Sequence, residues 1–187
     1  MATITITGDA HADRVLTDDP CALLLGMLLD QQFPMEHAFR GPAKILDRFG
    51  TLDPASIADA DPAEFATVCA TPPAVHRFPG SMAAKIQAVA RIVVDEYDGR
   101  AERLWEEAGS GTELVKRVEA LPGFGKQKAK IFAALVAKQL GIRPDGWERA
   151  VGDYALEGYR SVADVTDHDS LDKVRAFKKE QKAAGRI

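Results

Sequence analysis

Apolar positions recur at helical spacing through most of the chain, which predicts an all-α protein. Ile86, Val89 and Val93 fall on one face of a helix predicted over residues 82–98, and residues 126–140 repeat the pattern. Only the first seven residues alternate as a strand does, and no useful strand pattern follows them.

Three helix starts are marked by an Asp that can cap the helix and a Pro suited to its first turn, at residues 19–20, 53–54 and 61–62. The first of them precedes a nearly continuous apolar run, Ala22 to Leu29. A helix that is apolar on all sides is buried, so we expect this one to be central and to end near Pro34.

Other boundaries rest on single residues. Gly41 and Pro42 are expected to kink or split a helix over residues 35–49. Ser81 and Thr112 are expected to cap the helices that follow them. Two last helices are predicted over residues 146–159 and 170–184.

Charge is distributed unevenly along the 187 residues, whose net charge is -4. Residues 1–70 carry four Lys or Arg against eleven Asp or Glu, whereas residues 121–150 and 171–187 each carry six against two. Two basic segments in an acidic protein are typical of a surface that meets a polyanion. The alternative is that these segments are solvated helix faces.

Cysteine content and hydropathy exclude other classes of protein. Cys21 and Cys69 are far apart, so neither a disulfide framework nor a thiolate-bound metal site is expected, and both are expected to be buried. No apolar run approaches the ~20 residues of a membrane span. We therefore expect a cytoplasmic protein that does not contact membranes, with no side-chain metal site.

The stretch "LPGFGKQKAK" predicts a tight hairpin between two helices. Pro122 stops the first helix, and Gly123 and Gly125 can take positive φ and leave the backbone bare. The second helix would then present free N–H groups and its positive dipole end to an anion such as a DNA phosphate. An ordinary helix–helix turn is the alternative. The residues predicted to bind the DNA backbone are Pro122, Gly123, Phe124, Gly125, Lys126, Lys128 and Lys130.

The longer stretch from Leu121 to Gly146 resembles the helix-hairpin-helix and Gly/Pro/Asp (HhH-GPD) motif of the DNA glycosylase superfamily. In that family a catalytic aspartate follows the hairpin proline at a nearly constant spacing, and Asp145 lies 23 residues after Pro122. The resemblance covers most of residues 20–160. It implies a DNA glycosylase of base excision repair, which hydrolyses the N-glycosidic bond of a damaged or mismatched base in double-stranded DNA.

The resemblance also implies a two-lobed, all-helical fold with a central cleft. One lobe would comprise residues 19–142, with the hairpin at about 112–140. The second would comprise residues 1–18 and 143–187, with the catalytic Asp and a basic C-terminal helix. Asp145 would then lie at the mouth of the cleft.

Other segments match the family more loosely. Gln32, after "LLLGMLLDQ", matches the glutamine that fills the gap left by an extruded base, and His76, Arg77 and Phe78 match a loop that wedges into the opposite strand. Trp147 and Tyr154 are candidates to stack on the extruded base, although aromatic residues at helical spacing are also typical of a core.

A carboxylate at position 145 would stabilise the positive charge that builds on the deoxyribose as the glycosidic bond breaks, or orient the attacking water. The alternative role of Asp145 is an N-cap for the next helix, and both roles are compatible. Asp153 is a weaker candidate, because it falls inside a predicted helix and off the family spacing.

Gln127 occupies the position at which strand-cleaving relatives carry a Schiff-base lysine. Lys126 and Lys128 flank it but point elsewhere on a helix, toward phosphate or solvent. We therefore expect a monofunctional enzyme that removes the base without forming a covalent adduct.

No cysteine follows Cys69, so the iron–sulfur cluster of several relatives is not expected. Its place would be taken by the basic helix near the C-terminus, whose lysines either contact phosphates or are solvated. A monovalent cation at the hairpin is compatible with the resemblance. We expect a monomer, and the identity of the base is not readable from the motif. The alternatives to an enzyme are a non-catalytic HhH DNA-binding protein and a protein–protein module.

Overall fold

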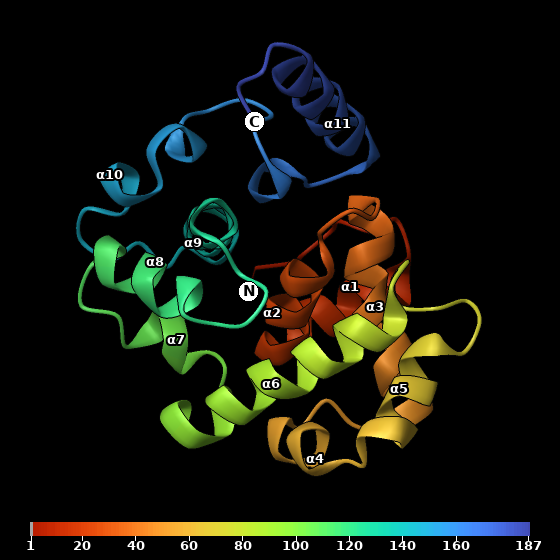
Figure 1. The fold of residues 1–187 in the computed structure, drawn as a ribbon. Coiled ribbons are helices and arrows are strands. Elements are labelled where there is room, and N and C mark those ends of the chain that lie inside the picture. The colour runs from red at the N-terminus through yellow and green to blue at the C-terminus, as the bar shows by residue number, and fades with distance from the viewer. Residues whose placement is uncertain (1) are drawn as a thin grey trace.

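Helices are the regular elements of the protein in the computed structural model, which describes residues 2–187. Figure 1 shows their arrangement. The α2 helix lies beside α1 and α3, and α6 crosses near these three helices. The elements are α1 (Ala10–Asp18), α2 (Pro20–Leu29), α3 (Met35–Phe49), α4 (Pro54–Asp59), α5 (Pro62–Ala70), α6 (Pro79–Tyr97), α7 (Arg103–Glu106), α8 (Gly111–Glu119), α9 (Lys126–Leu140), α10 (Trp147–Val151), the 3-10 helices η1 (Gly152–Ala155) and η2 (Val162–Asp164), and α11 (His168–Ala183). The all-α prediction is confirmed.

The α2 helix is buried on every side, as its continuous apolar sequence predicts. Every residue from Cys21 to Leu29 is buried, and the helix packs against α1, α3 and α6. The side chain of Asp19 accepts from the N–H of Cys21 at 2.9 Å, so the predicted cap is confirmed. The helix ends at Leu29, five residues before Pro34. Both cysteines are buried, as expected.

The short helices α4 and α5 follow from the same local chemistry. The carboxylate of Asp53 accepts from the N–H of Ser56, and that of Asp61 accepts from the N–H groups of Ala63 and Glu64. Both helices pack against α6. Here the Asp-Pro pairs predicted the start of each helix correctly.

Tertiary packing overrides the prediction at Gly41 and Pro42. The α3 helix runs through both residues without being split, and both are buried. A Cβ atom at Gly41 would lie 2.4 Å from Cδ1 of Leu29, so the glycine lets α3 approach α2 closely. The burial of this face holds the helix together across the proline.

Two predicted caps and one predicted helix are wrong. The α6 helix begins at Pro79, before Ser81, and Ser110 rather than Thr112 caps α8 by accepting from the N–H of Glu113. The helix predicted over residues 146–159 is broken into α10 and η1 because Gly152 has φ +63°, which is not helical.

The first residues are extended but pair with no strand in the described part of the chain. Instead, the N–H of Ile4 donates to Oγ1 of Thr17, and the N–H of Thr7 donates to the carboxylate of Asp13. Side chains of α1 therefore replace the ladder that the alternation predicted. Within residues 2–187, no helix has the length and hydrophobicity needed to cross a membrane.

Candidate nucleic-acid interface

The turn between α8 and α9 is a tight hairpin. Leu121 is buried, and its carbonyl accepts from the N–H of Phe124 at 3.1 Å. Gly123 has φ +83°, a conformation that other L residues adopt only with strain. Phe124 is also buried, 6.4 Å from the ring of Phe132. The side chain of Phe124 therefore packs in the core, and its N–H is hydrogen-bonded within the turn. Neither group is free to contact DNA, contrary to the prediction.

The start of α9 offers bare backbone to an anion. Gly125 is the N-cap residue, and no side chain accepts from the first N–H groups of the helix. Gly125 is exposed, and a Cβ atom there would meet nothing within 4 Å. Lys126 is exposed and Lys130 half-buried beside it. Free N–H groups, the positive end of the helix dipole and the lysines together favour a phosphate.

The hairpin is docked on the C-terminal end of α2. A Cβ atom at Gly123 would lie 2.5 Å from Cδ1 of Leu28 and 3.7 Å from Nε2 of Gln31. The amine of Lys128 donates to the Leu28 carbonyl at 2.8 Å. Lys128 therefore points into the contact between α2 and α9, and the expectation that it faces phosphate or solvent is wrong. The hairpin and the end of α2 therefore lie against each other, and we call their shared face the hairpin surface.

The residues after α2 have an unusual backbone. Gln32 is exposed and has φ +52°, one of two non-glycine residues with positive φ in residues 2–187. Such strain is found most often at functional sites. The carbonyl oxygen of the preceding residue, Gln31, lies 2.8 Å from Nε2 of His76.

His76 fastens the next loop to the end of α2. The N–H of Phe78 donates to its Nδ1 at 2.9 Å, so Nε2 carries the proton and donates to Gln31. Burial lowers the pKa of His76, which favours this neutral form. Arg77 and Phe78 are exposed, with the guanidinium 5.3 Å from the ring. The loop therefore offers two of the three predicted wedge residues, while His76 is buried.

A cavity of about 320 Å³ lies between the start of α9, η1 and α11. The side-chain amide of Gln127 donates to the hydroxyl of Tyr154 at 2.8 Å, and both residues line the cavity. Asp153 and Lys178 line it as well. The volume is near the lower limit of ordinary ligand sites, which suits a single planar ring system.

Asp30, the C-cap residue of α2, is a half-buried carboxylate that the motifs did not identify. Desolvation raises its pKa, while Lys178 and Lys128 oppose the rise. Desolvation also lowers the pKa of Lys128 to about 8, although Asp30 acts in the other direction. The only local signal was a charged residue directly after a fully buried helix.

These elements together match one known family. The family model described as the HhH-GPD superfamily of base excision DNA repair proteins matches residues 25–185. The chain belongs to this superfamily.

Solved structures of glycosylases share the fold at low identity. The H. pylori 3-methyladenine DNA glycosylase bound to 1,N6-ethenoadenine has a TM-score of 0.51 and 15% identity, over 90% of this chain and 93% of that one. A trapped endonuclease III–DNA covalent intermediate has a TM-score of 0.47 and 16% identity, over 70% of this chain and 56% of that one. A thermostable thymine-DNA glycosylase has a TM-score of 0.44 and 18% identity, over 75% of this chain and 60% of that one. The chain thus spans less than two thirds of the last two proteins. No curated protein matches it.

The HhH-GPD aspartate, Asp145, lies toward the far end of α9 from the hairpin. The helix has 15 residues, about 22 Å at ~1.5 Å per residue. Asp145 comes four residues after Gly141, a reach of at most ~14 Å. Its carbonyl accepts from the N–H of Gly111 at the start of α8, at 2.8 Å.

Asp145 is exposed and does not cap α10, because Gly146 is the N-cap residue, with φ +74° and no side-chain bond. The N-cap alternative is therefore wrong. The position of Asp145 at the mouth of a cleft stays a prediction. Trp147 is buried. Its backbone packs on the start of α8, where a Cβ atom at Gly111 would lie 2.4 Å from its Cα atom. Trp147 is therefore a core residue, as the alternative interpretation expected, and not a residue of the base pocket.

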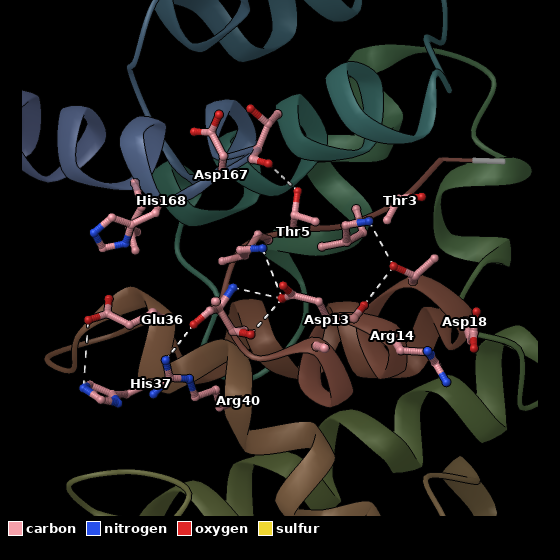
Figure 2. A pocket seen from close by; sticks show the side chains of 18 of the residues that line it. Thr3, Thr5, Asp13, Arg14, Asp18, Glu36, His37, Arg40, Asp167 and His168 are labelled. Atoms are coloured by element: carbon pink, nitrogen blue, oxygen red, sulfur yellow. Dashed lines mark hydrogen bonds and ion pairs between the residues drawn. The ribbon is translucent and has the colours of Figure 1, made fainter.

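A second cavity of this HhH-GPD protein, about 950 Å³, has a scaffold role. Figure 2 shows it between the N-terminal segment, α3 and the start of α11. Its polar groups bind each other: Arg40 donates to the Thr7 carbonyl at 2.7 Å, and Asp13 accepts from the Thr7 hydroxyl at 2.8 Å. No hairpin residue lines it. These bonds fasten the N-terminal segment to α1 and α3.

Proposed function

We propose that this protein is a monofunctional DNA glycosylase, which hydrolyses the N-glycosidic bond of a damaged or mismatched base in double-stranded DNA. The observation that carries the proposal is the uncapped start of α9, docked at the same surface as the strained Gln32 and next to a cavity of base size. Membership of the base excision repair superfamily supports it. We also propose that it acts as a monomer in the cytoplasm.

The DNA backbone would be held without reading of sequence. The free N–H groups at Gly125 and the first turn of α9 suit one phosphate, and Lys126 and Lys130 add positive charge beside it. Contacts of this kind position a duplex and make affinity fall with salt.

The base would leave the duplex at the end of α2. Rotating a base out of the stack costs roughly a few kcal/mol, and less when the base is damaged or mismatched. Gln32, exposed on a strained backbone, would fill the gap, while Arg77 and Phe78 would enter the opposite strand. The cavity lined by Gln127 and Tyr154 would receive the base.

Hydrolysis without a Schiff base follows from the side chains at the start of α9. The amide of Gln127 is not a nucleophile. The amine of Lys128 is not free to attack the sugar, because it donates a hydrogen bond to the Leu28 carbonyl. Neither cysteine lies near the C-terminal region, so no iron–sulfur cluster enters the proposal. On family spacing alone, Asp145 is the candidate carboxylate, and this assignment stays a prediction.

Base release is the direct test. Duplexes with uracil, oxidised, alkylated or mismatched bases would be incubated with the wild-type protein and then treated with alkali, which cuts at abasic sites. We expect release of at least one base class, with strand cleavage only after the alkali. Release by the wild type that is lost in Asp145→Asn would support the family assignment of Asp145.

The second candidate is a non-catalytic HhH DNA-binding protein. The position of Asp145 beside the start of α8, at the other end of that helix from the hairpin, favours it. It would be supported by tight binding of every duplex without release of any base. A protein–protein module predicts no DNA affinity, or an affinity that does not fall with salt.

A further inference from the structure

The cavity beside the start of α9 is lined mainly by cations. Its charged side chains come from four separate segments, which are α9, η1, the loop after η1 and the chain from α11 onward. They are Lys130, Asp153, Arg160, Lys178 and Arg186. Four cations therefore surround the cavity together with one carboxylate, and a molecule inside it lies in a positive field.

The positive charge of the cavity is not neutralised by ion pairs. Other cations of α9 and α11 are paired, such as Lys138 with Asp164 at 2.7 Å. None of the four cations of the cavity forms an ion pair within residues 2–187. Three of them are half-buried, whereas Asp153 is exposed. Water screens an exposed charge more than a half-buried one, so the cations outweigh the carboxylate.

The uncharged groups of the cavity suit a flat ring with carbonyl oxygens. The hydroxyl oxygen of Tyr154 accepts from the side-chain amide of Gln127, so the hydroxyl proton is free to be donated. Phe177 lines the cavity with a half-buried ring, and aromatic rings stack on bases. The cavity thus combines a stacking surface with hydrogen-bond donors and positive charge.

The charge of the departing base separates two classes of substrate. When a neutral base leaves, the electron pair of the C1′–N bond makes it an anion. In a pyrimidine-2,4-dione such as uracil, this charge spreads onto the carbonyl oxygens. A cationic base such as 7-methylguanine leaves as a neutral molecule instead. Cations beside the base therefore stabilise the transition state for the first class and repel the second class.

We propose that the cavity takes a neutral pyrimidine-2,4-dione base, and that its cations, Lys178 among them, stabilise the negative charge on this base as it leaves. The inference rests on the glycosylase function proposed above and names its substrate class. The volume of about 320 Å³ agrees with a base that has a single ring.

The atoms and charges balance with water as the only co-reactant. As the C1′–N bond breaks, its electron pair goes to the ring nitrogen of the base, and the cations of the cavity stabilise the negative charge on the carbonyl oxygens. The base anion then takes a proton from solvent. Water adds through its oxygen to C1′ of the sugar and loses a proton to solvent. The products are the free base and an abasic site.

Single-turnover release of the base at saturating enzyme tests the inference, because DNA affinity then does not affect the rate. The duplexes would carry uracil, 7-methylguanine, or 5-fluorouracil, which forms a more stable anion than uracil does. We expect the wild type to release uracil and 5-fluorouracil. Relative to spontaneous loss, it should accelerate the release of 7-methylguanine about 100-fold less than that of uracil.

Replacing Lys178 by Met should slow the release of uracil about tenfold or more. The release of 5-fluorouracil should slow less, because a more stable anion depends less on outside charge. Lys178→Arg keeps the charge and should keep most of the rate, and Lys130→Met provides a second variant from another helix. The matched control is Lys179→Met, which removes one charge from the adjacent residue of α11. Lys179 is exposed and does not line the cavity, so both rates should stay unchanged.

Several results would overturn the inference. One is a greater acceleration for 7-methylguanine than for uracil, and another is release of other bases without release of uracil. Unchanged release of uracil in both Lys178→Met and Lys130→Met would remove the cations from the reaction. An equal loss for uracil and 5-fluorouracil in Lys178→Met would assign this lysine to a DNA phosphate or to stability. If the wild type releases no base from any duplex, the proposed function itself fails.

Discussion

Two glycines of the hairpin, two residues apart, should respond differently to the addition of one methyl group. Gly123 has φ +83°, and a Cβ atom there would lie 2.5 Å from Cδ1 of Leu28. The left-handed conformation costs a non-glycine residue about 1–2 kcal/mol, and overpacking adds about 1–3 kcal/mol. Alanine loses less backbone entropy on folding than glycine does, which offsets about 0.4–1 kcal/mol of this cost. Gly123→Ala should therefore reduce the free energy of unfolding by about 1–5 kcal/mol.

Gly125 is the matched control, because its φ of -93° suits any residue and a Cβ atom would meet nothing within 4 Å. Gly125→Ala should change the free energy of unfolding by less than about 1 kcal/mol. The methyl group would nevertheless lie over the first N–H groups of α9, where N-cap side chains lie. Hydrogen bonds to a charged phosphate are worth about 1.5–3 kcal/mol, so DNA affinity should fall about tenfold or more.

Urea unfolding and DNA binding at one salt concentration measure the two effects. The expected pattern is a large loss of stability in Gly123→Ala and a loss of affinity without loss of stability in Gly125→Ala. Equal stability of Gly123→Ala and the wild type would refute the docking of the hairpin on α2. Undiminished affinity in Gly125→Ala would refute the phosphate site.

Three further predictions concern the lysines of α9. Borohydride should trap no adduct between the wild type and abasic-site DNA; an adduct that disappears in Lys128→Ala would show that the amine acts as a nucleophile. Because the pKa of Lys128 is lowered to about 8 by burial, the unfolded chain binds more protons above that pH. Urea unfolding of the wild type should therefore show stability rising relative to Lys128→Met between pH 8 and about 10, and a constant difference would contradict the burial. Replacing Lys126 by Ala should lower the slope of log affinity against log salt by about 1, and an unchanged slope would remove this lysine from the phosphate contacts.

Local chemistry made much of the fold predictable. Asp19, Asp53 and Asp61 cap the helices that follow them, because capping depends on residues within one turn. The failures arose where distant packing decides. The α3 helix continues through Gly41 because the missing side chain admits Leu29, which comes from another helix.

The site was predictable only in part. The hairpin glycines and Gln32 are local features, and the structure brings them to one surface. The helical pattern predicted α9 over residues 126–140 correctly, but the contact of Asp145 with the start of α8 joins distant residues and was not readable from the spacing. Asp30 gains its environment from Lys128, which lies close to 100 residues away in the sequence and contacts Leu28, so no local pattern identified it.

Binding of a DNA phosphate by the start of α9 is the central claim, and a crystal structure of the protein with a duplex that carries a tetrahydrofuran abasic-site analogue would test it most directly. We predict a phosphate oxygen of that duplex within about 3 Å of the N–H groups in the first turn of α9. A duplex bound with no phosphate at the start of α9 would contradict the account.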